Sequence, residues 1–363
     1  RSAYLPFGMN SNFVALILKK ENAIDIRDFR PVSIGNTMPK LISKIMARIL
    51  REISKDLISG NQFGFVLGRN IQICLYTASE CVNVMRRKVK DGNMEVNIDI
   101  SKAFDTILWS FLFTILKMHG FSRNFIGLIS SIPESARLSI LINGSPRGFF
   151  QSSKGVRQGD PLSGLLFSIV EDYLSWCLTD LANFSWYQRM RVGRKLCAPS
   201  NLFYADDILL FGRADKGTIS CINSIFSHYE EVAGKVINWD KSSIIFGGGI
   251  STSRQIRIAC KLGVKIGSLP FNYLGVPLFW GRVKRGYFYS IALRITSQLA
   301  GWKGKSLSQD GRVCPVNSVI TSMFVYYFSL YRWPMALIKD LNGKIRNFIW
   351  TGSIHERKLV TVA

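Results

Sequence analysis

Two adjacent aspartates stand in the middle of an apolar stretch, FYADDILLF at 203–211. The apolar residues on both sides predict two short strands, and the residues between them predict the tight turn of a hairpin. Two ionised carboxylates in such surroundings cost on the order of several kcal/mol unless something compensates their charge. Asp206 and Asp207 therefore indicate either an ordinary turn, where Asp is common, or a site for a divalent cation.

A third carboxylate, Asp99, lies in an alternating stretch, NMEVNIDI at 93–100. The alternation predicts a strand that ends at Asp99. If this strand lies beside the hairpin, Asp99, Asp206 and Asp207 converge at one edge of a sheet. Carboxylate oxygens suit Mg²⁺, with Mn²⁺ as an alternative, and three carboxylates can hold two ions roughly 3.5–4 Å apart. Because this arrangement serves in-line displacement at phosphorus, the three aspartates are the candidate metal ligands.

The chain is strongly basic. Its 363 residues contain 47 Lys or Arg against 24 Asp or Glu, a formal net charge of +23. Residues 281–363 alone carry 13 Lys or Arg against 3 Asp or Glu. Nucleic acid is the leading candidate partner, because each neutralised phosphate releases condensed counterions. A content of 47% hydrophobic residues with 11 prolines excludes a disordered chain.

Other features narrow the class of protein. The seven cysteines are scattered, without CxxC spacing or paired histidines, which predicts free thiols in a reducing compartment and no zinc site. The stretch that comes nearest to a membrane span, residues 321–338, contains Arg332 and Pro334, so it predicts a buried helix and no membrane association. The chain begins with Arg1, and we interpret it as a fragment.

The remaining pattern alternates helices with short strands. It predicts an amphipathic helix with a basic face over 36–56, a second helix over 71–90, and a helical segment over 281–363. Asp160 and Pro161 predict the N-cap and first position of a long helix. Because the helices lie between strands that mostly arrive as hairpins, we expect an α+β fold with helices on one face of an antiparallel sheet.

Five motifs occur in one order and at distances that are typical of a single family. They are LILKKENAIDIRDFRPVSIGN at 16–36, IDISKAFD at 98–105, GVRQGDPLSGLLFSIV at 155–170, YADD at 204–207 and FNYLGVPL at 271–278. Together they resemble the reverse transcriptase domain of LINE-type (non-LTR) retrotransposons, especially those abundant in plant genomes. Further stretches look like family segments, and they are NQFGFVLGRNI at 61–71, INWDKSSIIF at 237–246 and WKGKSLSQDGRVCPVNSVI at 302–320. The resemblance therefore covers nearly the whole chain.

The resemblance implies a right-hand polymerase fold with fingers, palm and thumb. Residues 1–95 would form the fingers with an N-terminal extension. Residues 96–280 would form the palm, an antiparallel sheet backed by helices, with a fingers-like insertion over about 106–150. Residues 281–363 would form a truncated, helical and basic thumb or connection.

The resemblance also assigns catalytic residues. Asp99, Asp206 and Asp207 match the catalytic set of the palm, which binds two Mg²⁺ ions. Lys241 matches a lysine that protonates the departing pyrophosphate as a general acid. Asp105 has a weaker claim, because a new helix is expected to begin there and an N-terminal charge or cap explains a carboxylate equally well.

Five positions match the family's contacts with the incoming nucleotide. Lys19 and Arg30 match fingers cations that grip the triphosphate, where Arg adds a bidentate fork. Phe104 matches the aromatic ring under the sugar, which clashes with a 2′-hydroxyl and so selects deoxynucleotides. Gln158 and Gly159 match the contact with nucleotide and template, since a glycine lets the backbone approach closely.

The last family positions concern the primer and the duplex. Three residues match the turn that grips the primer strand, Tyr273, Leu274 and Gly275. Four thumb residues are expected near the duplex backbone by analogy, Trp302, Lys303, Lys305 and Arg312. Contacts of this kind position a duplex without reading its sequence. The chain departs from the family at Leu18, Ala23 and Gly164, where relatives usually have proline, which puts the rigidity of those loops in doubt.

The activity that the resemblance implies is RNA-directed DNA polymerisation, in which an RNA template is copied onto a DNA primer from dNTPs. Such an enzyme would be translated in the cytoplasm and act in the nucleus, and no pattern indicates its oligomeric state. Four alternatives remain. Phe104 disfavours an RNA-copying RNA polymerase, and a group II intron maturase would need a further RNA-binding domain. The intact Asp99, Asp206 and Asp207 argue against a decayed element that only binds nucleic acid. A generic metal nuclease would need further acid clusters or grouped histidines.

Overall fold

The structure, a computed structural model, describes residues 8–19, 22–192 and 196–357. The chain divides into two compact units. The first contains residues 1–74 and 84–267, and the second contains residues 75–83 and 268–363. The residues expected at the catalytic centre and around the nucleotide all belong to the first unit, whereas the expected primer grip belongs to the second.

The first unit is built around a six-stranded sheet. Its strands are β3 (Asn93–Ser101), β6 (Asn201–Tyr204), β7 (Asp207–Arg213), β8 (Val236–Ile237), β9 (Ser243–Phe246) and β10 (Lys265–Ile266). The order is β10-β9-β3-β7-β6, and β8 pairs with the C-terminal end of β3. Strand β3 is antiparallel to both of its main neighbours, β7 and β9. The predicted strand and hairpin are confirmed, although β3 continues beyond Asp99 to Ser101.

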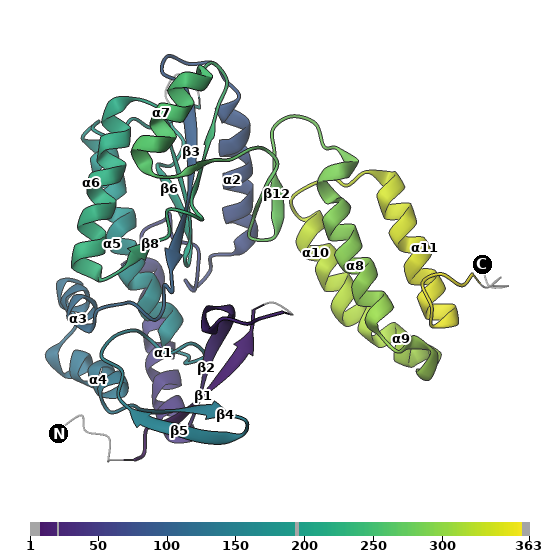
Figure 1. The fold of residues 1–363 in the computed structure, drawn as a ribbon, viewed down its shortest axis with the longest axis horizontal. Helices are drawn as coiled ribbons and strands as arrows, with labels where there is room; N and C mark the ends of the chain where they lie inside the picture. Colours follow the sequence, from purple (N-terminus) through teal and green to yellow (C-terminus); the bar gives the residue numbers. More distant parts are fainter. Residues whose placement is uncertain (1–7, 20–21, 193–195, 358–363) are drawn as a thin grey trace. The chain divides into compact units, whose positions relative to one another are not determined.

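Helices pack against the apolar face of this sheet. Met94, Val96 and Ile98, alternate residues of β3, are at most 1% exposed and belong to the hydrophobic core. The unit contains five helices besides α1 (Thr37–Leu57) and α2 (Ile71–Met85), namely α3 (Trp109–Met118), α4 (Arg123–Glu134), α5 (Ser163–Asn183), α6 (Lys216–Ala233) and α7 (Thr252–Leu262), among the residues that the structure describes. In Figure 1, α5 and α6 run alongside β3 and β6. The period of two in the sequence thus places every second side chain under these helices.

A smaller sheet forms the other part of the first unit. Its strands are β1 (Ser11–Leu18), β2 (Phe29–Gly35), β4 (Arg137–Ile142) and β5 (Ser145–Phe150), in the order β2-β1-β4-β5, and the short 3₁₀ helix η1 (Ile26–Asp28) precedes β2. Strand β1 is antiparallel to β2 and parallel to β4. Helix α1 (Thr37–Leu57) confirms the amphipathic helix predicted over 36–56, whereas α2 (Ile71–Met85) ends earlier than the predicted 71–90.

The start of α5 differs from the prediction. The helix begins at Ser163, its N-cap residue is Leu162, and no side chain caps it. Asp160 instead accepts hydrogen bonds from the Leu162 N–H (2.9 Å) and from the Ser43 hydroxyl (2.9 Å). The prediction that Asp160 caps this helix is therefore wrong, because its carboxylate is used one turn earlier to tie the preceding loop to α1.

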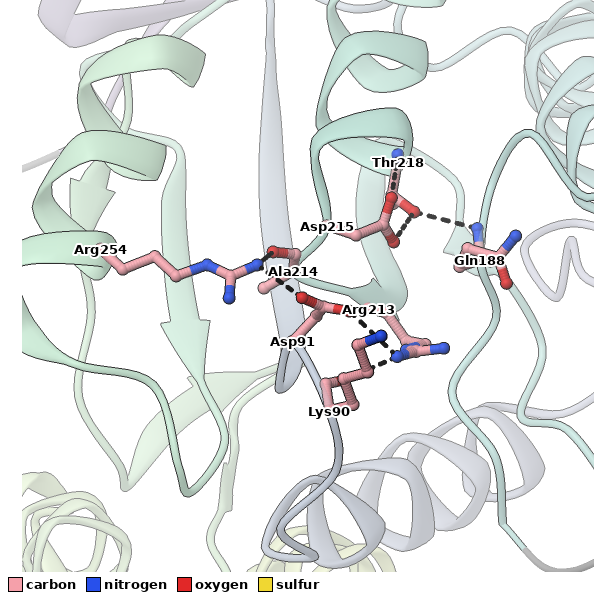
Figure 2. A network of polar contacts seen from close by, with 8 residues as sticks. All are labelled: Lys90, Asp91, Gln188, Arg213, Ala214, Asp215, Thr218 and Arg254. Atoms are coloured by element: carbon pink, nitrogen blue, oxygen red, sulfur yellow. Dashed lines mark hydrogen bonds and ion pairs between the residues drawn. The ribbon is translucent and has the colours of Figure 1, made fainter.

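A polar network holds the N-terminal end of β3 (Figure 2). Asp91 lies between two cations, Arg213 at the end of β7 and Arg254 on α7, each 3.2 Å from one of its carboxylate oxygens. Asp215 caps α6 by accepting a hydrogen bond from the Thr218 N–H (3.0 Å). Because these side chains come from a loop, a strand and two helices, the network fixes how α6 and α7 attach to the sheet.

The second unit contains residues 75–83 of α2, a short hairpin and further helices. Strands β11 (Phe271–Tyr273) and β12 (Val276–Leu278) form the hairpin. The helices are η2 (Arg285–Phe288), α8 (Tyr289–Gly301), η3 (Gly304–Ser306), α9 (Gln309–Pro315), the π-helical η4 (Val316–Ile320), α10 (Thr321–Phe328) and α11 (Met335–Thr351). The helical character predicted from residue 281 onward is confirmed.

The apolar stretch 321–338 does not form the single buried helix that its composition predicts. It contains α10, a turn and the first residues of α11, because Pro334 disfavours a helical conformation in the residue before it. Trp333, in the turn, is 3% exposed. Among the described residues, no helix is both long and apolar enough to span a bilayer.

Candidate active site

The sheet brings the three predicted aspartates to one end of β3. Asp99 on β3 and Asp207 at the start of β7 are direct partners in the antiparallel register. Asp206 lies in the turn between Tyr204 and Asp207, which are themselves partners across the hairpin. Ala205, the first residue of that turn, has a φ of 55°. A left-handed residue at this point lets the chain reverse within two residues, so Asp206 stays beside the Asp99–Asp207 pair.

The three carboxylates affect one another electrostatically. The pKa of Asp207 is raised to about 6, first by partial burial and then by the negative charges of Asp206 and Asp99. Burial and Asp206 also raise the pKa of Asp99, while Lys241 and a hydrogen bond with Asn238 oppose the rise. Like charges gathered in partly desolvated surroundings favour a bound cation that would offset them.

The segment 238–242 holds Asp99 from the other side. The Asn238 N–H donates to the Asp99 carbonyl (2.8 Å), and the Asp99 N–H donates to the Ser242 hydroxyl (3.1 Å). The Ser242 hydroxyl in turn donates to the Asn238 carbonyl (2.8 Å). Lys241 is an exposed residue of this turn, so its ammonium is accessible near the aspartates.

No metal site is preformed among the described residues. Within residues 8–19, 22–192 and 196–357, no group of three or more His, Cys, Asp or Glu side chains is arranged to hold a metal ion. The metal-ligand role of Asp99, Asp206 and Asp207 therefore stays a prediction. The register and the pKa shifts support their proximity, and their oxygens are the donor type that Mg²⁺ prefers.

A cavity of about 610 Å³ lies next to Asp206. Its wall includes four residues predicted to contact the nucleotide, Arg30, Phe104, Gln158 and Gly159. Phe65 and Gly164 also line it, although the sequence had given neither of them a part in a binding site. Gly159 has a φ of 93°, a left-handed conformation that favours glycine. Residues from β2, from the loop before α5 and from the aspartate turn therefore line the same cavity.

Phe104 is held between two other rings. It stacks on Phe167 with a centroid distance of 4.3 Å and an interplanar angle of 16°. The edge of Phe65 meets it at 6.3 Å and 87°. The Phe104 carbonyl accepts a hydrogen bond from the Val156 N–H (2.8 Å). The ring is therefore fixed by core packing below and by an aromatic contact at the cavity.

Lys19 and Gln158 both influence Asp105, which lies outside the aspartate cluster. Burial raises the pKa of Asp105, and the charges of Lys102 and Lys19 and a hydrogen bond with Gln158 oppose the rise. Helix α3 begins only at Trp109, so Asp105 does not serve as the N-terminal charge or cap of a helix. Its carboxylate instead interacts with Gln158 in the loop before α5, and the charge of Lys19, the residue after β1, favours its ionised form.

The segment 61–65 was missed as part of the site. It runs beside β6, with backbone hydrogen bonds from the Phe63 N–H to the Phe203 carbonyl (2.7 Å) and back from the Phe203 N–H to the Asn61 carbonyl (2.8 Å). The buried Gln62 side-chain carbonyl accepts from the Ala205 N–H (3.1 Å) and the Gly64 N–H (2.9 Å). We call residues 61–65 the turn latch, because it holds the aspartate turn from outside the hairpin.

The turn latch also sets the position of Phe65. This residue is 53% exposed and has a φ of 61°, which is uncommon for a residue with a side chain. The only sequence signal for it was the motif NQFGF, whose glycine allows close contact. A Cβ on Gly64 would lie 2.5 Å from the Ala205 nitrogen.

The family model described as "Reverse transcriptase (RNA-dependent DNA polymerase)" matches residues 17–278. The chain belongs to the reverse transcriptase family. The resemblance drawn from the motifs is confirmed, and the matched range contains all the predicted catalytic, nucleotide and primer-grip residues.

The curated relatives of this reverse transcriptase include proteins of transposable elements. The Transposon TX1 uncharacterized 149 kDa protein of Xenopus laevis is 26% identical over 362 residues, which cover 96% of the chain and 26% of that protein. A Pol polyprotein from the type-1 retrotransposable element R2 of Popillia japonica is 30% identical over 172 residues, which cover 47% of the chain and 27% of that protein. The chain thus spans about a quarter of the length of these relatives.

A solved structure supports the fold of the reverse transcriptase. Apo telomerase from Candida tropicalis aligns with a TM-score of 0.51 at 12% identity, covering 96% of this chain and 59% of that chain. Likeness at this identity concerns the fold alone, and it is consistent with the predicted α+β polymerase architecture.

The expected primer grip is the β11–β12 turn of the second unit. Tyr273 is buried, and Leu274 and Gly275 have φ values of 49° and 78°, so they form a two-residue turn in which both residues are left-handed. The Tyr326 hydroxyl donates to the Leu274 carbonyl (2.5 Å). The turn is thereby held to α10 within its own unit.

The four predicted thumb residues differ in their surroundings. Arg312 donates to the carbonyls of Gly304 (2.8 Å) and Ile349 (3.1 Å), and Trp302 packs on Phe348. These two side chains hold the helices of the unit together. Lys303 and Lys305 are exposed, and Lys305 pairs with Glu356 at 2.6 Å.

Proposed function

We propose that this chain is the RNA-directed DNA polymerase domain of a LINE-type (non-LTR) retrotransposon, which adds dNTPs to the 3′-hydroxyl of a DNA primer on an RNA template. The observation that carries the proposal is the pairing of Asp99 with Asp207, beside Asp206 and a cavity lined by Phe104 and Gln158. The family match and the net charge of +23 support a nucleic acid substrate.

Two Mg²⁺ ions, with Mn²⁺ as an alternative, would be held by Asp99, Asp206 and Asp207. The fit rests on the chemistry of the donors and on the repulsion that raises the pKa of Asp207. When bound, the ions would lower the pKa of the primer hydroxyl and neutralise the triphosphate and the leaving pyrophosphate.

The chain's own side chains would bind and orient the nucleotide. Arg30 and Lys19 would neutralise the triphosphate, and Gln158 with Gly159 would contact the nucleotide and template. Phe104 would lie under the sugar and exclude a 2′-hydroxyl. Lys241, exposed beside Asp99, would donate a proton to the departing pyrophosphate.

The wider assignments follow from the same proposal. Residues 1–95 would act as fingers, 96–280 as palm and 281–363 as the thumb or connection. Tyr273, Leu274 and Gly275 would grip the primer, and the exposed Lys303 and Lys305 would contact the duplex backbone. The enzyme would act in the nucleus after translation in the cytoplasm.

Primer extension on an RNA template with Mg²⁺ and dNTPs tests the proposal. We expect the wild-type chain to extend the primer and Asp206→Asn to lose at least 100-fold in rate. Asp56→Asn, at an exposed position of α1, removes the same charge and should extend at the wild-type rate. If Asp206→Asn extended the primer at the wild-type rate, the catalytic role of Asp206 would be contradicted. No extension by any variant, with RNA binding preserved, would leave a nucleic-acid-binding protein without catalysis.

A further inference from the structure

A buried cation lies beneath the ring that lines the nucleotide cavity. The Lys235 ammonium is 4.5 Å from the centroid of Phe167, and Phe167 stacks on Phe104. Lys235 is 1% exposed and Phe167 is fully buried, whereas Phe104 is only partly buried and lines the cavity. The three residues thus connect the core of the first unit to the surface at which a sugar would lie.

Lys235 is fixed by two further contacts. Its Nζ lies 2.9 Å from Glu171 Oε1, and both side chains are completely buried. Its ammonium also donates a hydrogen bond to the carbonyl of Ala103, the residue directly before Phe104. One cation therefore contacts both the ring below Phe104 and the backbone that carries Phe104.

Stability alone explains this arrangement poorly. A buried ion pair often contributes no more than well-packed apolar residues of the same volume, because desolvation of both charges offsets their attraction. An apolar pair would fill the space between α5 and the segment after α6, but it would not hold the Ala103 carbonyl in one direction. The Lys235–Glu171 ion pair fixes the orientation of the Ala103 carbonyl, directly before Phe104.

We propose that Lys235 and Glu171, acting through Phe167 and the Ala103 carbonyl, are positioning residues that set how far the Phe104 ring enters the nucleotide cavity. The pair thereby controls discrimination between deoxyribonucleotides and ribonucleotides. This inference rests on the proposed polymerase function, and it assigns a specificity role to residues that contact no substrate.

The test variant replaces the whole pair, Lys235→Met with Glu171→Leu, because removing one partner would leave an uncompensated buried charge. The measured quantity is the ratio of kcat/KM for dCTP to that for CTP in single-turnover primer extension. We expect the ratio to fall at least tenfold while the rate with dCTP changes less than threefold. The matched control, Lys344→Met with Asp340→Leu, removes an ion pair on α11 and should leave the ratio unchanged.

A second background separates positioning from a general loss of structure. In a Phe104→Ala chain, which should already accept ribonucleotides, the change of the Lys235 pair should alter the ratio no further. An unchanged ratio in the wild-type background, or an equal fall in both backgrounds, would overturn the proposal.

A measurement without catalysis distinguishes failure of this inference from failure of the polymerase function. With 4-fluorophenylalanine at position 104, the ¹⁹F resonance should shift or broaden in the Lys235→Met, Glu171→Leu chain and stay unchanged in the α11 control. If the wild-type chain extends no primer, the proposed function and the selectivity role both fail. If the resonance stays unchanged, the positioning itself is refuted, whatever the activity.

Discussion

Gly164 lies directly beneath the ring of Phe65, so substitution by alanine tests how the cavity wall is built. A Cβ at this position would lie 2.6, 2.8 and 2.9 Å from three ring carbons of Phe65. Side chains do not tolerate such distances, so the ring or the helix must move. Because Phe65 is 53% exposed, we expect the ring to swing into solvent and away from Phe104.

Two opposing effects set the free energy of unfolding of Gly164→Ala. Alanine favours the first turn of α5 by up to about 1 kcal/mol. Displacement of the ring loses the aromatic edge contact, worth about 0.5–1.5 kcal/mol, and residual overpacking costs on the order of 1 kcal/mol. We therefore expect the single variant to be destabilised by about 1 kcal/mol, and Gly164→Ala in a Phe65→Ala background to be stabilised by a few tenths to about 1 kcal/mol.

Urea denaturation of the four proteins in this double-mutant cycle measures the coupling, which should be about 1–2 kcal/mol. Primer extension should show a higher KM for dNTPs in Gly164→Ala and a smaller change in kcat, because the cavity wall moves while the aspartates stay in place. The same effect of Gly164→Ala in both backgrounds, within about 0.3 kcal/mol, would refute the contact.

Three further predictions concern the neighbouring residues. Gln62→Ala removes the acceptor for the Ala205 N–H, so the free energy of unfolding measured with urea should fall by roughly 1–3 kcal/mol. Primer extension should also become slower. An unaffected extension rate would exclude the turn latch as a support of the site. In metal-free buffer the pKa of Asp207 in the folded protein, about 6, is higher than its ordinary value of 3.8. The contribution of Asp207 to stability is therefore present at low pH and is lost as the pH rises through about 6. Asp207→Asn should flatten this part of a plot of melting temperature against pH, and an unchanged plot would contradict the pKa shift. Gly155 has a φ of 85°, and in Gly155→Ala the new Cβ would lie 2.6 Å from the backbone carbonyl oxygen of Asp105. The variant should therefore melt several degrees lower than the wild type in differential scanning calorimetry. An unchanged melting temperature would refute the predicted clash.

The sequence predicted the elements whose signal is local. Alternation over 93–100 identified β3, and helical spacing identified α1 to within a residue at each end. The candidate catalytic aspartates could be named because two of them are adjacent and the third belongs to a recognisable motif. Local signals gave a wrong prediction where a side chain forms a hydrogen bond with a residue distant in the sequence. Asp160, for example, accepts a hydrogen bond from Ser43 and does not cap α5.

The residues that support the cavity could not be found in this way. Gln62 is an uncharged polar residue in a loop, and only the fold shows that its carbonyl meets the aspartate turn. Lys235 and Glu171 lie far apart in the chain, and each alone resembles a surface charge. Their pairing is visible only when the segment after α6 packs against α5.

The sequence by itself determined the family, the α+β class and the identity of the candidate catalytic and nucleotide residues, because these depend on composition, periodicity and short motifs. The tertiary structure decided the Asp99–Asp207 register, the turn latch and the stack from Lys235 to Phe104. These features join segments that are far apart in the chain, and antiparallel pairing, burial and charge desolvation act on atoms that meet only after folding.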